Sequence, residues 1–170
     1  IKHALIGDPG LFYLLENTAR LPDPLSDLPR FEDILIRSLQ VKIDIVRKDQ
    51  REQGPRRVLN LGHTVAHALE KRYRIGHGTA GAAGLTATAR LSMRYGYLRR
   101  ETGIRILTLL DEIFEGITRK YSIRGLGNIL RQDKKRYGED LHMVLLEDIG
   151  RVIVRRIPLT ELQEALDDIC

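Results

Sequence analysis

Apolar residues return every three or four positions along most of the chain, and this spacing predicts a mostly helical protein. The clearest case is the stretch 30–48, where the apolar positions are Phe31, Ile34, Leu35, Val41 and Ile45. The same spacing predicts helices over 9–17, 57–73, 80–95, 101–114, 125–135 and 160–169. The chain opens at Ile1 inside an apolar pattern that is typical of the end of a helix, which suggests a piece of a longer protein.

Local signals indicate where several of these helices begin and end. Asp8 followed by Pro9 is a typical N-cap and first-turn pair. Thr160, with Gln163 three residues later, has the spacing of a capping box. Loops or turns are predicted where proline, glycine and short polar residues gather, over 21–29, 53–55 and 76–78.

Two short apolar runs late in the chain, 141–146 and 151–155, flank a turn-like segment and predict a β-hairpin. Strands and helices do not alternate, no glycine-rich phosphate loop follows a strand, and no internal repeat is present. We therefore expect an all-α fold with one small hairpin. A single domain covering 1–170 is long enough to bury its own core.

Composition excludes several classes of function. The chain is 42% hydrophobic and 30% charged, as ordinary globular proteins are. No apolar run is long enough to span a bilayer and nothing resembles a signal peptide, so no membrane role is expected. The single cysteine, Cys170, excludes a disulfide framework and favours a reducing cytoplasm. The net charge of +5 comes from basic residues interleaved with acidic ones, which is typical of solvated helix faces and argues against nucleic-acid binding.

Three histidines make a candidate metal site. His63 and His67 are four residues apart on one predicted helix, so both rings project from the same face. His77 follows in the predicted turn, close enough to fold back toward them. Such pairs also occur as ordinary surface or core residues, and catalytic zinc usually has three protein ligands. The other two histidines, His3 and His142, are interpreted as ordinary residues.

Groups that bind anions surround these histidines in the sequence. Lys42, Arg56 and the Asn60 amide could converge on a carboxylate or phosphate, with the arginine offering two parallel donors. Asn60 lies three positions before His63, so it is expected on the same helix face. Glu52 adds a possible acid or base. Each of these residues alone is most simply a solvated polar group, and only their concentration indicates a site.

Several motifs resemble the 3-dehydroquinate synthase family. The segment 51–70, REQGPRRVLNLGHTVAHALE, resembles the signature helix of that family, and 77–84, HGTAGAAG, is similar to the histidine-glycine segment that follows it. The segment 1–6 matches the end of another family motif, and 131–135 matches the late aspartate-lysine-lysine motif. The predicted hairpin also fits. The resemblance therefore covers the whole chain in order.

The resemblance implies a two-domain enzyme of the shikimate pathway, which leads to the aromatic amino acids. Family members convert 3-deoxy-D-arabino-heptulosonate 7-phosphate to 3-dehydroquinate with loss of phosphate, so they are phosphate-eliminating lyases. The resemblance implies that an N-terminal domain outside this chain binds NAD, while a helical C-terminal domain carries zinc or another divalent metal. The sugar phosphate would bind in the cleft between the two domains, and the full-length enzyme would be a homodimer.

The matched motifs imply roles for individual residues. His63 and His77 match the two zinc-ligating histidines, whereas His67 matches a residue that contacts substrate. The other matches to substrate-site positions are Lys2, Lys42, Glu52, Arg56, Asn60 and one of Lys134 and Lys135. The third zinc ligand of the family is a glutamate two positions before the residue that matches Ile1. The isolated chain is therefore expected to be inactive.

Two departures leave alternatives open. The turn before His77 is shorter than in many family members, and Thr79 stands where an acidic residue is usual. A sister cyclase that makes 2-deoxy-scyllo-inosose or a valiolone-type ring is therefore an alternative, and a metal-dependent polyol dehydrogenase is a more distant one. The late lysine motif and Arg56 favour a substrate with phosphate and carboxylate. A basic helical binding module would instead bind nucleic acid in a salt-sensitive way and would need no zinc.

Overall fold

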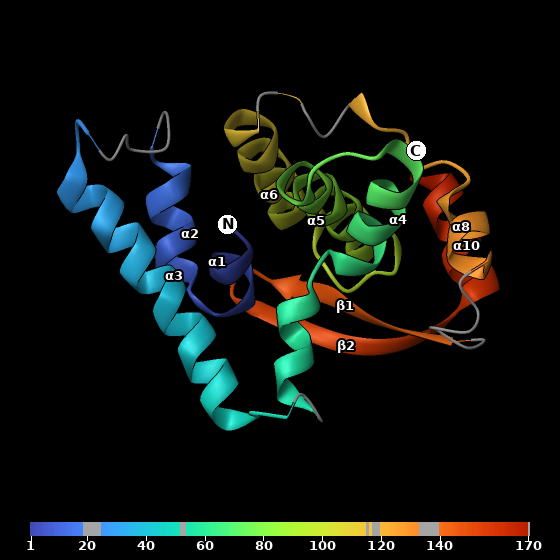
Figure 1. Cartoon of the computed structure of the whole chain (residues 1–170), viewed down its shortest axis with the longest axis horizontal. Coiled ribbons are helices and arrows are strands. Elements are labelled where there is room, and N and C mark those ends of the chain that lie inside the picture. Colours follow the sequence, from blue (N-terminus) through green and yellow to red (C-terminus); the bar gives the residue numbers. More distant parts are fainter. Residues whose placement is uncertain (19–24, 52–53, 115, 117–119, 133–139, 170) are drawn as a thin grey trace.

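The structure, a computed structural model, describes residues 1–18, 25–51, 54–114, 116, 120–132 and 140–169. Helices dominate it, and one long antiparallel hairpin passes below them (Figure 1). The elements in chain order are α1 (Lys2–Gly7), α2 (Pro9–Glu16), α3 (Leu28–Lys48), the 3-10 helix η1 (Pro55–Asn60), α4 (His63–Tyr73), α5 (His77–Arg94), α6 (Arg100–Ile113), α8 (Leu126–Gln132), β1 (Asp140–Asp148), β2 (Arg151–Pro158) and α10 (Leu159–Asp168). The predicted fold class, helical with one hairpin, is confirmed.

Helices α2 and α3 begin close to where the sequence predicts. The Asp8 carboxylate caps α2 by accepting from the backbone N–H of Leu11, and Pro9 occupies the first turn. Asp27 caps α3 in the same way. Both carboxylate oxygens of Asp8 also accept hydrogen bonds from Arg37, at 2.8 and 2.9 Å, which ties α3 to the start of α2.

Helix α3 lies at the edge of the molecule and has no fully buried residue (Figure 1). Its inner face still packs on the body through half-buried Ile34, Val41 and Ile45. A hydrogen bond of 2.7 Å between Ser38 Oγ and His3 Nδ1 adds a polar contact to α1. Helix α3 therefore rests against α1 along one side and leaves its other side exposed.

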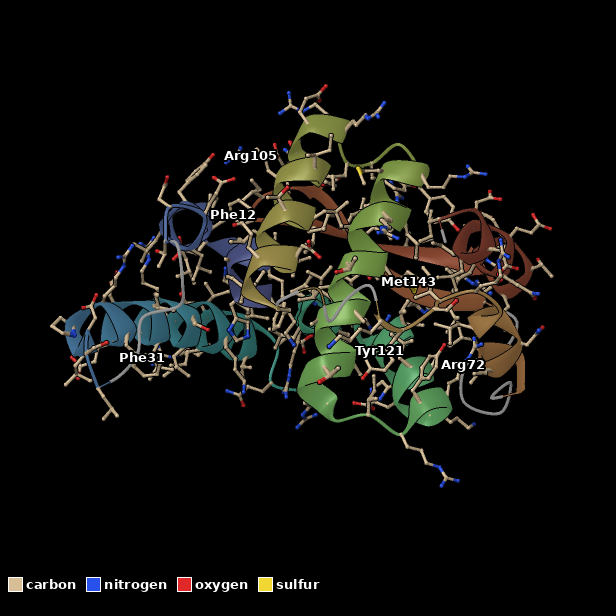
Figure 2. All side chains as sticks on the ribbon, turned by 90° about the horizontal axis from the view of Figure 1, so that it is seen from above. Phe12, Phe31, Arg72, Arg105, Tyr121 and Met143 are labelled. Atoms are coloured by element: carbon tan, nitrogen blue, oxygen red, sulfur yellow. The ribbon has the colours of Figure 1, made fainter. Side chains whose placement is uncertain are left out.

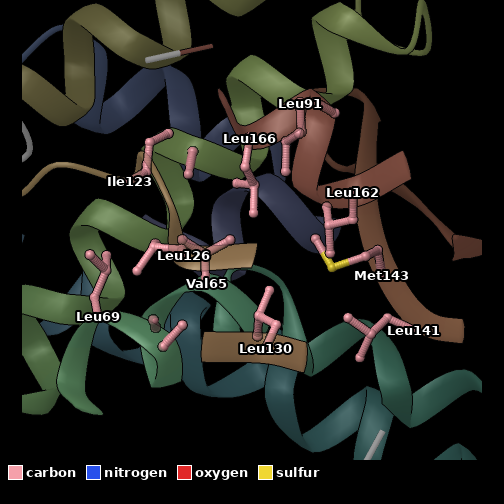
Figure 3. Packing of buried hydrophobic residues seen from close by; sticks show 14 of the residues in the cluster. Val65, Leu69, Leu91, Ile123, Leu126, Leu130, Leu141, Met143, Leu162 and Leu166 are labelled. Atoms are coloured by element: carbon pink, nitrogen blue, oxygen red, sulfur yellow. The ribbon is translucent and has the colours of Figure 1, made fainter. Parts of the chain in front are cut away.

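The hairpin separates two hydrophobic clusters. Because side chains alternate along a strand, Met143 and Leu145 of β1 enter one cluster while Val144 and Leu146 enter the other. The first cluster is formed with α4, α5, α8 and α10, and Figure 3 shows its packing around Val65 and Leu126. The second cluster is formed mainly with α1, α2 and α6. Both faces of β1 are thus buried at its centre, which fixes the hairpin beneath the helices.

Arg105 on α6 closes the second cluster at its rim. Its guanidinium donates to both carboxylate oxygens of Glu16 on α2, at 2.9 and 2.6 Å, and lies 5.8 Å from the ring centre of Phe12 (Figure 2). The bidentate pair raises the pKa of Arg105 and holds α6 against α2.

Three expectations about local structure were wrong. The stretch 57–73 is not one helix, because Gly62 adopts a left-handed conformation with φ of 81° and separates η1 from α4. Asn60 and His63 therefore lie on different elements, and the shared helix face expected for them does not exist. The segment 76–78 is not a turn, because α5 already begins at His77.

The third error concerns the last helix. Helix α10 begins at Leu159 after Pro158, and its start has no side-chain cap, so the capping box expected at Thr160 and Gln163 does not form. The amide Nε2 of Gln163 instead lies 3.4 Å from Asn128 Oδ1 on α8. Thr160 is the second residue of α10 and therefore cannot act as its N-cap.

Within the described residues, no helix combines the length and the apolar composition needed to cross a bilayer.

Candidate metal and substrate site

The three predicted histidines come together at the start of α4 and α5. His63 is the first residue of α4, His67 lies one turn later, and His77 is the first residue of α5. The ring centres are 5.8 Å apart for His63 and His77, 5.5 Å for His63 and His67, and 6.5 Å for His67 and His77. Two imidazoles on one tetrahedral zinc, with N–Zn bonds of about 2.1 Å, would place their ring centres about 5 Å apart. The observed spacing of His63 and His77 is therefore compatible with one shared ion.

Glycines at the crossing of α4 and α5 allow this approach. A Cβ added to Gly84 would overlap the carbonyl oxygen of Gly62 and would lie 3.1 Å from Ala66 Cβ. The two helix backbones are therefore nearly in contact at this point. Because only residues 74–76 separate the helices, α5 returns beside α4 and brings His77 next to the end of α4 that carries Glu70.

Glu70 is a member of this group that the sequence analysis missed. Its two carboxylate oxygens accept hydrogen bonds from His77 Nδ1 at 2.7 Å and from His67 Nδ1 at 3.1 Å. The hydrogen bond from His77 is the main reason why the pKa of Glu70 is lowered, against an opposing effect of burial. The spacing of Glu70, three residues after His67 on the same helix, was the available signal.

Lys2 approaches the same group from α1. Its ammonium donates to the carbonyl oxygen of Leu59 at 3.0 Å and lies 3.3 Å from His63 Nε2. Burial, and then the charge of Lys42, lowers the pKa of Lys2. Burial, and then the charge of Lys2, lowers the pKa of His63 to about 4, so this ring is neutral near pH 7. A neutral imidazole is the form that binds a metal.

The other predicted site residues that the structure describes lie on different elements from the three histidines. Lys42 is exposed on α3 and acts on Lys2 through its charge. Asn60 is exposed at the end of η1. Arg56, near the start of η1, donates from Nη1 to the carbonyl oxygen of Gln50 at 2.8 Å. Glu52, Lys134 and Lys135 lie outside the described residues.

The described residues supply an incomplete metal site. No three histidine, cysteine, aspartate or glutamate side chains among them are arranged to hold a metal ion together. Both oxygens of Glu70 already accept from imidazole nitrogens, so this carboxylate is not an available ligand. His63 and His77 fit two positions of a zinc site, and a further protein ligand would have to come from outside this group.

Sequence comparison relates the chain to one family of proteins. A family model described as "3-dehydroquinate synthase C-terminal" matches residues 1–136. The 3-dehydroquinate synthase of Thermosynechococcus vestitus is 37% identical over 98% of this chain and 47% of its own length. That of Coxiella burnetii is 39% identical over 91% of this chain and 44% of its own length. The chain thus spans about half the length of the curated relatives it matches.

Solved structures share the fold. The 2-epi-5-epi-valiolone synthase of Streptomyces hygroscopicus subsp. jinggangensis 5008, solved with NAD+ and Zn2+, matches with a TM-score of 0.77 and 21% identity. That match covers 99% of this chain and 48% of the synthase. A 2-deoxy-scyllo-inosose synthase, solved with carbaglucose-6-phosphate, NAD+ and Co2+, matches with a TM-score of 0.69 and 20% identity over 94% of this chain and 50% of its own. At such identities the likeness concerns the fold alone.

Proposed function

The chain belongs to the 3-dehydroquinate synthase family, and we propose that it is the metal- and substrate-binding half of a 3-dehydroquinate synthase. The proposed reaction converts 3-deoxy-D-arabino-heptulosonate 7-phosphate to 3-dehydroquinate and phosphate, as a step toward the aromatic amino acids. The observation that carries the proposal is the pair His63 and His77, whose ring centres lie 5.8 Å apart. Lys2, another matched position, lies beside His63.

We assign His63 and His77 to the metal, with zinc or another divalent ion as the expected occupant. When bound, such an ion supplies Lewis acidity to an alcohol or ketone oxygen of the substrate. His63 is suited to this role because its ring stays neutral near pH 7. Lys2 lies where its ammonium could pair with an anionic substrate once His63 Nε2 is engaged by the metal.

The remaining matched residues are assigned to the substrate. Lys42 and Arg56 carry fixed positive charge suited to a carboxylate, and the guanidinium can form two parallel hydrogen bonds to it. Asn60 and His67 offer hydrogen-bonding groups. Glu52 and one of Lys134 and Lys135 complete the proposed set of substrate-binding residues. We assign that lysine to the phosphate group of the substrate.

The relatives favour this reaction over that of the sister cyclases. Proteins named 3-dehydroquinate synthase match at 37% and 39% identity. The two sister cyclases match at 21% and 20% identity. The homodimer and the cytoplasmic location implied by the resemblance stay predictions.

We assign NAD to a separate N-terminal domain, so this chain alone should not turn over substrate. The described sheet is only a two-stranded antiparallel hairpin, whereas dinucleotide sites of the doubly wound type need a strand, a glycine-rich turn and a helix. Without a hydride acceptor the oxidation that begins the proposed reaction cannot occur. The purified chain, given zinc, NAD and the heptulosonate phosphate, should release no phosphate above background. Turnover by the chain alone would overturn this assignment.

Metal binding tests the site directly. Calorimetric titration of the purified chain with Co2+ should show one metal-binding site. His63→Ala and His77→Ala should each weaken binding at least about tenfold, because each removes one of few protein ligands. His142→Ala is the matched control, since His142 is exposed on β1. Equal binding by all four proteins would exclude His63 and His77 as the metal site.

A further inference from the structure

Glu70 connects the two helices that carry the histidines. It lies on α4 and reaches His77, the first residue of α5, with one oxygen while the other oxygen reaches His67. The Glu70 side chain is 26% exposed, whereas the His77 side chain is 70% exposed. Few neighbours therefore restrain the His77 ring, and the hydrogen bond of 2.7 Å to Glu70 is the polar contact that orients it.

These hydrogen bonds select one tautomer of each ring. A carboxylate can only accept hydrogen bonds, so His67 and His77 must each carry their proton on Nδ1. In the neutral form of each ring, Nε2 is then unprotonated and has a free electron pair. The ammonium of Lys2 acts on His63 in the complementary way, because it can only donate, and so it requires an unprotonated His63 Nε2. In their neutral forms all three rings are therefore held as the Nδ1–H tautomer, with Nε2 unprotonated.

We infer that Glu70 is a positioning residue that holds His77 in the orientation and tautomer needed for metal ligation, and His67 in the same tautomer toward substrate. This inference rests on the proposed function, in which His63 and His77 bind the metal. When a histidine ligand donates a hydrogen bond to a carboxylate from its second ring nitrogen, the carboxylate fixes the orientation of the ring. It also makes the unprotonated nitrogen a stronger electron-pair donor to the metal. Without Glu70, His77 would lose this restraint and would sample both tautomers and other rotamers.

A merely structural role for Glu70 would link α4 to α5 without affecting the histidine rings. Nuclear magnetic resonance of the metal-free chain separates the two roles, because ring 15N shifts report which nitrogen is protonated. About two pH units above the ordinary imidazole pKa of about 6.5, His77 should show the Nδ1–H tautomer. Glu70→Ala should shift His77 and His67 toward the Nε2–H form, and Glu164→Ala, at an exposed site on α10, should change neither. A wild-type His77 that is mainly Nε2–H would overturn the inference.

Metal affinity provides the second measurement. Glu70→Ala should weaken Co2+ binding by about 10–100-fold, the usual cost of losing such a partner. Glu70→Gln should have an intermediate effect, since its amide oxygen can still accept one hydrogen bond but its nitrogen cannot. Glu70→Gln also serves as the second variant if Glu70→Ala does not fold, as judged by circular dichroism. Glu164→Ala should bind Co2+ as the wild type does.

The histidine variants separate failure of this inference from failure of the proposed function. If His63→Ala and His77→Ala lose Co2+ binding while Glu70→Ala and Glu70→Gln stay within twofold of the wild type, Glu70 does not position the ligands although the metal site stands. If none of these variants changes Co2+ binding, the assignment of the metal site is wrong, and the inferred role of Glu70 is then wrong as well. Weaker Co2+ binding by the histidine variants and by the Glu70 variants, together with the tautomer shift, supports the inference.

Discussion

Replacing Gly84 by alanine tests the close contact of α4 and α5 on which the histidine site depends. The added methyl group would overlap the carbonyl oxygen of Gly62 and lie 3.1 Å from the Cβ and the backbone nitrogen of Ala66. Two of these three atoms belong to the backbone, so no side-chain rotation relieves the clash. The first turn of α4, which carries His63, would have to move away from α5.

Gly81 on the same helix is the matched control, because a Cβ added there would meet nothing within 4 Å. Alanine is favoured over glycine inside a helix by about 0.5–1 kcal/mol, and Gly81→Ala should gain stability of that order. Gly84→Ala gains the same helix preference, but its clash with backbone atoms adds an overpacking cost in the upper part of the usual range, about 2–3 kcal/mol. We therefore expect Gly84→Ala to be about 1–2 kcal/mol less stable than the wild type and roughly 2–3 kcal/mol less stable than Gly81→Ala.

Urea denaturation followed by circular dichroism measures these differences, and thermal midpoints of the two variants should differ by about 5–10 °C. Gly84→Ala should also bind Co2+ more weakly than the wild type, because His63 moves relative to His77. Equal stability of Gly84→Ala and Gly81→Ala would refute the near contact of the two backbones.

Two further predictions concern the substrate and pH. In the full-length enzyme, Arg56→Ala should reduce kcat/KM by the equivalent of about 2–5 kcal/mol, with only partial rescue in Arg56→Lys, because an ammonium lacks the planar pair of donors. A kcat/KM of Arg56→Ala within twofold of the parent would exclude that role. Burial, with the charges of Lys2 and Lys42, lowers the pKa of His3 to about 4, so between about pH 6.5 and pH 4 the unfolded chain binds a proton that the folded chain does not. Unfolding free energy should fall across that window as the pH falls, by roughly 1–2 kcal/mol after allowance for solvent screening. His3→Asn, which keeps a polar partner for Ser38, should flatten the slope, and an unchanged slope would contradict the assignment.

Short-range patterns determined most of the secondary structure. Asp8 and Pro9 start α2 as predicted because an N-cap needs only a side chain and the backbone three residues away. The two apolar runs that predicted the hairpin correspond to β1 and β2, since cross-strand pairing near a tight turn is also local. The motifs likewise identified the family, because a matched segment carries its identity in its residues.

Tertiary contacts decided the features that the sequence analysis missed. Gly62 interrupts the predicted helix 57–73 where the backbones of α4 and α5 meet. A spacing pattern within 57–73 holds no information about contact with a helix that begins only at His77. Helix α10 begins at Leu159, so Thr160 lies inside the helix and is not its N-cap, and Gln163 contacts Asn128 on α8, thirty-five residues away in sequence.

In the histidine group, the sequence determined some features and the tertiary structure determined others. Residue types and spacing singled out His63, His67 and His77 as candidates, and the family resemblance implied a separate role for each. Their ring nitrogens, however, are oriented by Glu70 and Lys2. Lys2 lies sixty-one residues from His63 in sequence. The tautomer of each neutral ring depends on these contacts. The contact of His67 with Glu70 is local to α4, whereas the contacts of His77 with Glu70 and of His63 with Lys2 join different helices and form only in the tertiary structure.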